Sequence, residues 1–161
     1  MPQENAMSVY DRLAAAGITL PPVAIPAAAY VPYVRSGNLV FVSGQIAIAA
    51  GRPLHAGKLG RDLSVDQGAE AARGCAINAL AVARQAAGSL DNVARVVKLT
   101  VFVASAEGFG DQPTIANGAS DLLRDVFGDA GVGARSAVGV AELPLGASVE
   151  AEFIFELRDG V

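Results

Sequence analysis

Apolar residues along this chain repeat with period two in some segments and with a helical period in others, which predicts both strands and helices. Residues 8–17 have the pattern of a short helix, with a serine cap before it and a glycine at its end. Residues 18–32 carry four prolines and should be extended. A Gly37-Asn38 turn predicts a β-hairpin over residues 33–43, and the glycine-rich, charged residues 50–63 predict a surface loop or an irregular short strand.

The middle of the chain predicts its longest helix and a buried strand. Ser64 and Gln67 match a capping box in front of an alanine-rich run that Gly88 should end, so a helix is expected over residues 65–87. Its small side chains would let it lie close against a sheet. The β-branched run that follows, up to Ala104, alternates between two faces and predicts a central strand.

The last third of the chain predicts a helix and two strands. Pro113 suits the first turn of a helix that continues with helical periodicity to Phe127. Two strands then flank the break at Leu143-Pro144, and we expect them to pair with each other. The whole order predicts an α+β fold in which helices pack on one face of a mixed β-sheet.

The length and composition indicate one domain that associates with itself. The chain has 161 residues, so we expect a single domain over residues 1–161, with residues 1–23 forming an N-terminal helix and a proline-rich extension. Hydrophobic residues make up 52% of the chain and charged residues only 17%. Some apolar surface must be covered by something other than charged side chains, which favours self-association.

The charge and the rare residue types exclude several classes of function. A net charge of −4 with scattered basic residues argues against a nucleic-acid partner. No stretch is long and apolar enough for a membrane span and no leader pattern is present, so we expect no membrane partner and a cytoplasmic protein. With Cys75 and His55 as the only residues of their types, no metal site is expected and no cofactor is implied. Cys75 should be an inert thiol inside the long helix.

The candidate chemistry lies in the last two strands. Glu150 and Glu152 fall on the face opposite the phenylalanines of the final strand, where carboxylates need water or a positive partner. Arg135 begins the preceding strand, and pairing of the two strands would bring it beside one of these glutamates. The spacing allows a structural ion pair as well as a ligand site, and it leaves the choice between Glu150 and Glu152 open. Gly44 ends a buried strand where a ligand could approach the backbone.

Four segments in sequence order resemble the Rid/YjgF family, also labelled the endoribonuclease L-PSP family. They are IPAAAYVPYVRSGNLVFVSGQIA, VVKLTVFVA, ANGASDLLRDVFG and ARSAVGVAELPLGASVEAE, which together span about residues 24 to 157. The run NGASDLL is similar to one branch of that family. The resemblance implies a chorismate-mutase-like fold that forms a homotrimer with ligand clefts between subunits, without a cofactor.

The resemblance also implies roles for individual residues. Arg135 would bind a substrate carboxylate, and Glu150 would place or activate the water that hydrolyses an imine. The residues that would line the cleft are Tyr33, Gly44, Asn117, Ser136 and Ala137. Ala137 stands where many deaminases of the family have cysteine, which argues against a cysteine-based reaction.

Two functions are compatible with these residues. The first is a cofactor-free hydrolytic deaminase of the 2-iminobutanoate/2-iminopropanoate type, which converts reactive 2-imino or enamino acids into a 2-keto acid and ammonia. The alternative is a non-catalytic trimer that binds or senses a small carboxylate in the same cleft. A ribonuclease role, an older label of the family, is disfavoured by the acidic pI of about 4.9.

Overall fold

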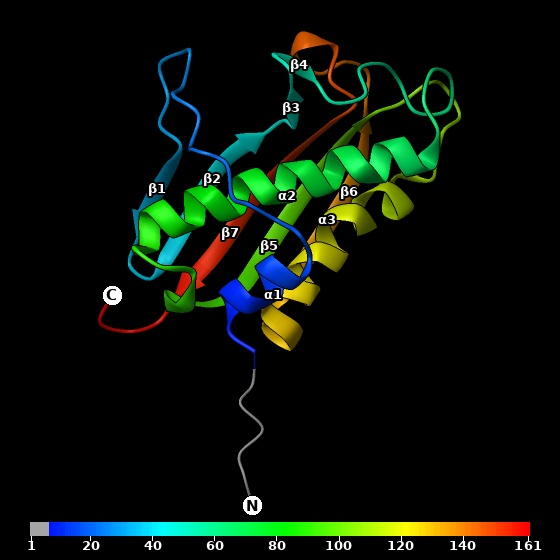
Figure 1. The fold of residues 1–161 in the computed structure, drawn as a ribbon. Helices are drawn as coiled ribbons and strands as arrows, with labels where there is room; N and C mark the ends of the chain where they lie inside the picture. The colour runs from blue at the N-terminus through cyan, green and yellow to red at the C-terminus, as the bar shows by residue number, and fades with distance from the viewer. Residues whose placement is uncertain (1–6) are drawn as a thin grey trace, which may run out of the picture.

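The computed structural model describes residues 7–161 and contains a mixed five-stranded sheet with helices on one face (Figure 1). The strand order is β1-β2-β7-β5-β6, and a separate two-stranded ribbon pairs β3 with β4. The elements are α1 (Val9–Ala15), β1 (Tyr33–Ser36), β2 (Leu39–Gln45), β3 (Ile48–Ala49), β4 (Arg52–Pro53), α2 (Val65–Ala87), β5 (Val93–Ala104), α3 (Gln112–Phe127), β6 (Ala134–Val140) and β7 (Val149–Leu157). The α+β architecture predicted from the sequence is confirmed.

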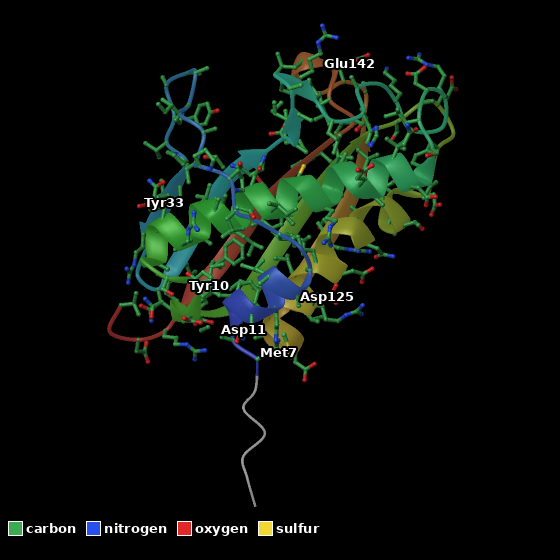
Figure 2. The ribbon with its side chains drawn as sticks, in the orientation of Figure 1. Met7, Tyr10, Asp11, Tyr33, Asp125 and Glu142 are labelled. Carbon is green, nitrogen blue, oxygen red and sulfur yellow. The ribbon has the colours of Figure 1, made fainter. Side chains whose placement is uncertain are left out.

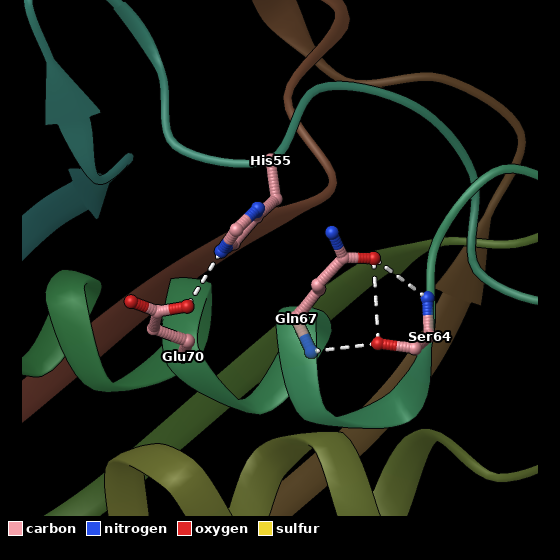
Figure 3. Close-up of polar contacts among 4 residues, drawn as sticks. All are labelled: His55, Ser64, Gln67 and Glu70. Atoms are coloured by element: carbon pink, nitrogen blue, oxygen red, sulfur yellow. Dashed lines mark hydrogen bonds and ion pairs between the residues drawn. The ribbon is translucent and has the colours of Figure 1, made fainter.

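The helix ends are set by the local signals that the sequence carries. Ser64 and Gln67 form the reciprocal capping box at the start of α2 (Figure 3), and Gly88 ends the helix with a φ of 78°. Ser8 and Asp11 form the same arrangement at the start of α1. Both predicted helices are confirmed. Of the expected N-terminal extension, residues 1–6 lie outside the part that the structure describes.

The sheet corrects one prediction, the pairing of the last two strands. Strand β6 runs parallel to β5, and β7 lies on the other side of β5, antiparallel to both β5 and β2. The order β5, α3, β6 is a strand–helix–strand crossover, which is the usual way to join parallel neighbours. The short connection at Pro144 therefore passes the end of β5 to reach β7, instead of joining two adjacent strands in a hairpin. The prediction that β5 lies inside the sheet is confirmed.

The core lies between the sheet and the two long helices. Phe153 and Phe155 of β7 are fully buried, with ring centroids 6.1 Å apart, and replacing either with alanine should cost about 3–5 kcal/mol. On α3, a Cβ built at Gly118 would lie 1.9 Å from the carbonyl oxygen of Ala69 on α2. Gly118 is therefore required for the close packing of α3 on α2, which fixes the position of α3 over β6.

The second face of the sheet has no helix over it in the described part of the chain, and it carries exposed apolar side chains (Figure 1). Val34 on β1, Phe41 on β2 and Val138 on β6 are 56%, 43% and 42% exposed. Strand register places these three side chains opposite the face that packs on α2 and α3. We call this surface the open face. Apolar side chains on a sheet face are typical of a surface that packs against another protein layer.

The loop over residues 50–63 combines both forms that the sequence allowed, since it holds β4 and otherwise irregular backbone. His55 contacts Glu70 of α2 with its ring nitrogen 2.6 Å from the carboxylate (Figure 3). Lys58 pairs with Glu142, at the far end of β6 (Figure 2), across 2.7 Å. These contacts fasten the loop to α2 and to the connection that follows β6.

Candidate functional site

Arg135 lies on the edge strand β6 and faces α3. Its side chain shares the face of its β5 partner Leu99, which is buried under the helices. A guanidinium nitrogen of Arg135 donates to the side-chain oxygen of Asn117 at 2.8 Å and to the hydroxyl of Ser120 at 3.2 Å. Arg135 and Asn117, two residues of the expected site, are thus in direct contact. Both acceptors are neutral, so they orient the guanidinium without cancelling its charge.

A hollow of about 250 Å³ opens beside this arginine. Its walls are formed by one side of α3, by the turn before β6 and by Arg135 itself; the lining residues are Leu99, Asn117, Ser120, Asp121, Arg124, Gly131, Val132, Gly133 and Arg135. We call it the Arg135 hollow. Within residues 7–161 Arg135 forms no ion pair, whereas Arg124 pairs with Asp121 at 3.0 Å. A planar guanidinium with free donors in a hollow is suited to hold a carboxylate.

Glu150 lies on β7, on the open face, in contact with Gly44. A Cβ built at Gly44 would lie 2.0 Å from a carboxylate oxygen of Glu150, so a larger residue there would displace the glutamate. The β2–β7 register slips between Val42 and Gln45, which places Gly44 at the irregularity. Burial, reinforced by the charge of Glu152, raises the pKa of Glu150 above its ordinary value of 4.5.

Arg135 and Glu150 do not meet within one chain. Arg135 is level with Leu99 on the helix-covered face, while Glu150 is level with Phe102 on the open face, and β5 separates the two strands by about 10 Å. The prediction that strand pairing brings Arg135 beside Glu150 or Glu152 is wrong, because it rested on the hairpin that β6 and β7 do not form. Glu152 shares the open face with Glu150.

The remaining predicted residues divide between the two faces. Ala137 faces the helices with Arg135, and Ser136 faces the open side beside Thr100. Tyr33 (Figure 2) pairs with the buried Val42 and packs against the core, away from Gly44. The sequence signal for the inward position of Tyr33 was the burial expected for Val42, because residues opposite each other on paired strands share a face.

Tyr30, which sequence reasoning missed, lines the same cavity as Gly44, whereas Tyr33 does not. This second cavity, of about 360 Å³, lies between the proline-rich segment, β2 and α2. The cavity is bordered mainly by prolines and aliphatic side chains, among them Ile46, Val82 and Leu145. Gly44 therefore has the Glu150 carboxylate against its α-carbon and an apolar cavity beside it.

Cys75 and His55 take no part in either arrangement. Burial raises the pKa of the Cys75 thiol to about 12, which confirms the prediction of an inert side chain. His55 is engaged with Glu70. Among residues 7–161, no group of three or more His, Cys, Asp or Glu side chains could hold a metal ion. None of the helices in that range is long and apolar enough to cross a membrane.

Comparison with known families settles where the chain belongs. The sequence model described as "YjgF/chorismate mutase-like, putative endoribonuclease" matches residues 10–156. The chain belongs to the YjgF family. The predicted resemblance is confirmed, and the sheet with its helices fits the chorismate-mutase-like fold of this family. The assignment to a branch marked by the NGASDLL run stays a prediction.

Individual relatives extend the match over nearly the whole chain. Protein TCP17 of Trypanosoma cruzi is 49% identical over 144 residues, which cover 89% of this chain and 90% of that protein. The solved structure of Atu1372 from Agrobacterium tumefaciens, described as of unknown function, is 43% identical with a TM-score of 0.85, covering 92% and 91% of the two chains. RidA from an Antarctic Psychrobacter is 25% identical with a TM-score of 0.59, covering 87% and 97%.

Proposed function

We propose that this member of the YjgF family is a cofactor-free hydrolytic deaminase that converts 2-imino or enamino acids into 2-keto acids and ammonia. The observation that carries the proposal is the Arg135 guanidinium, which is held by neutral side chains and opens into a hollow of about 250 Å³. Such a group binds the carboxylate that every 2-imino acid carries next to its reacting carbon. Membership of the YjgF family and the similarity to RidA also support this proposal.

The reaction needs orientation and proton transfer. Water adds to the imine carbon, the C=N π electrons move to nitrogen, and nitrogen takes up a proton. Transfer of the hydroxyl proton to nitrogen and cleavage of the C–N bond then release ammonia and leave the keto group. Arg135 would hold the carboxylate, while Glu150, whose pKa is raised, would accept the water proton and return it to nitrogen.

This chemistry requires a cleft formed between copies of the chain, since Arg135 and Glu150 face opposite sides of one sheet. The exposed Val34, Phe41 and Val138 on the open face supply apolar surface for such an assembly. We therefore propose a homotrimer in which Arg135 of one copy is brought near Glu150 of another. The same assembly would cover part of the apolar surface that the composition leaves in excess.

A second candidate is binding of a small carboxylate without turnover. The Arg135 hollow is built within a single chain, and Glu150 is not part of its wall. The hollow's own carboxylate, Asp121, is paired with Arg124. A carboxylate could therefore be bound there without any group placed to activate water.

Release of 2-oxobutanoate from 2-iminobutanoate, generated in the cuvette by oxidation of 2-aminobutanoate, separates the two functions. The wild type should accelerate release, and Arg135→Ala should lower kcat/KM by about 10- to 100-fold through loss of the charge-assisted bonds. Arg135→Lys serves as the matched control, because it keeps the charge and loses the planar fork.

Failure of the wild type to accelerate release would overturn the deaminase proposal. If 2-oxobutanoate nevertheless binds to the wild type and not to Arg135→Ala, the carboxylate-binding function is the correct one.

A further inference from the structure

A second charged pair lies in the wall of the Arg135 hollow. Asn117, Ser120, Asp121 and Arg124 follow one another at helical spacing on α3, so they form a stripe along one side of that helix. The first two bind Arg135, and the last two bind each other. The stripe thus supports one arginine with neutral groups and the other with a carboxylate.

The charges of the lining residues leave the hollow with one uncompensated cation. Arg135 and Arg124 each contribute a positive charge, and Asp121 contributes one negative charge, so the sum over the lining side chains is +1. The Arg124 and Asp121 side chains are 59% and 57% exposed, so the pair can open when a competing ligand enters.

We propose that the Asp121–Arg124 pair restricts the hollow to ligands with one carboxylate and an uncharged remainder. This inference rests on the proposed binding of a carboxylate by Arg135. A monocarboxylate that binds Arg135 brings the hollow to neutrality and leaves the pair undisturbed. The second carboxylate of a dicarboxylate meets Asp121 as a like charge and must displace it to reach Arg124. Asp121 is therefore a specificity-determining residue.

Two stable keto acids of equal chain length test the charge rule without a change in size: 2-oxopentanoate, with one carboxylate, and 2-oxoglutarate, with two. Their dissociation constants are measured by calorimetry for the wild type, Asp121→Asn and the double variant Asp121→Asn/Arg124→Gln. The wild type should prefer 2-oxopentanoate. Asp121→Asn frees Arg124 while keeping the shape of the side chain, so it should shift the ratio of the two constants toward 2-oxoglutarate by about 5-fold.

The double variant tests whether the shift requires Arg124, because it removes both members of the pair and leaves the lining side chains with the same sum of +1 as the wild type. Without Arg124 there is no cation to free, so the ratio should return to within about 2-fold of the wild-type value. A ratio that Asp121→Asn leaves unchanged, or that shifts equally in the double variant, overturns the inference. Binding of 2-oxopentanoate that is weakened by Arg135→Ala tests the underlying carboxylate site separately, so its failure is distinguishable from failure of the charge rule.

Discussion

The two charged groups proposed to act on the substrate are supported in opposite ways. Arg135 is oriented by two neutral side chains of α3 and opens into a hollow of its own chain. Glu150 accepts no hydrogen bond from any residue between 7 and 161, is half-buried and has Glu152 on the same face. One group is prepared to hold an anion, and the other is kept in surroundings that favour the protonated state.

This difference follows from where each group lies on the sheet. An edge strand beside a helix gives Arg135 polar side chains to contact, whereas a strand inside an uncovered face gives Glu150 only its strand neighbours. Binding and proton transfer make different demands, because a carboxylate ligand needs a permanent cation and a base needs a pKa near the working pH. Variants of Glu150 and Gly44 test whether Arg135 binds the substrate while Glu150 transfers the proton.

The largest effect is expected for Glu150→Gln. Loss of the base should lower kcat for 2-iminobutanoate by about 100- to 10,000-fold with little change in KM, because the carboxylate of the substrate is still held by Arg135. Steady-state keto-acid release measures both constants. Glu152→Gln, on the same face two residues away, is the matched control and should change kcat by less than about 3-fold. The reverse order of the two variants would assign the base to Glu152.

A smaller effect is expected for Gly44→Ala. The added methyl group would lie 2.0 Å from the Glu150 carboxylate, which sits at the end of a flexible side chain and would have to move. Misplacement of the base should lower kcat by about 10- to 100-fold while the protein remains folded. Gly110→Ala is the control, since a Cβ there meets nothing within 4 Å. Equal activity of the two variants would show that the position of Glu150 is unimportant.

The smallest effect concerns stability and pH. Because the pKa of Glu150 is raised on folding, the folded state binds the proton more tightly, and stability falls as pH rises through the interval between the unfolded and folded values. Glu150→Gln removes this loss, so the Tm of the variant should exceed that of the wild type at pH 7. The difference should shrink toward zero near pH 4. Thermal unfolding monitored by circular dichroism tests this, and a difference independent of pH would contradict the assigned cause.

The sequence predicts the local structure well and the strand order only in part. The ends of α2 are determined by residues that contact their own helix, Ser64, Gln67 and Gly88, so their signal is contained in a short window. The place of β6 depends on α3 crossing over the sheet, and the short link through Pro144 indicated a hairpin instead. The strand–helix–strand order over residues 93–140 was the signal for a parallel pair.

In the candidate site, too, the sequence indicates which residues take part but not how the strands arrange them. Among the expected site residues, Arg135 contacts Asn117 and Gly44 lies against Glu150, on opposite sides of the sheet. The side of the sheet on which each group lies could not be predicted, because it depends on which strands are neighbours. Tyr30, and not the expected Tyr33, lines the cavity next to Gly44; it precedes β1, so the alternation of that strand does not place its side chain.

The state of Cys75 makes this protein convenient for site-specific labelling. It is the only cysteine of the chain, it is fully buried, and its thiol has a pKa of about 12, so maleimides and similar reagents will not reach it in the folded protein. A cysteine introduced at Val132, which is 65% exposed in the wall of the Arg135 hollow, would therefore carry a fluorophore at a single known position. Such a probe would report occupancy of the hollow without removal of the native thiol.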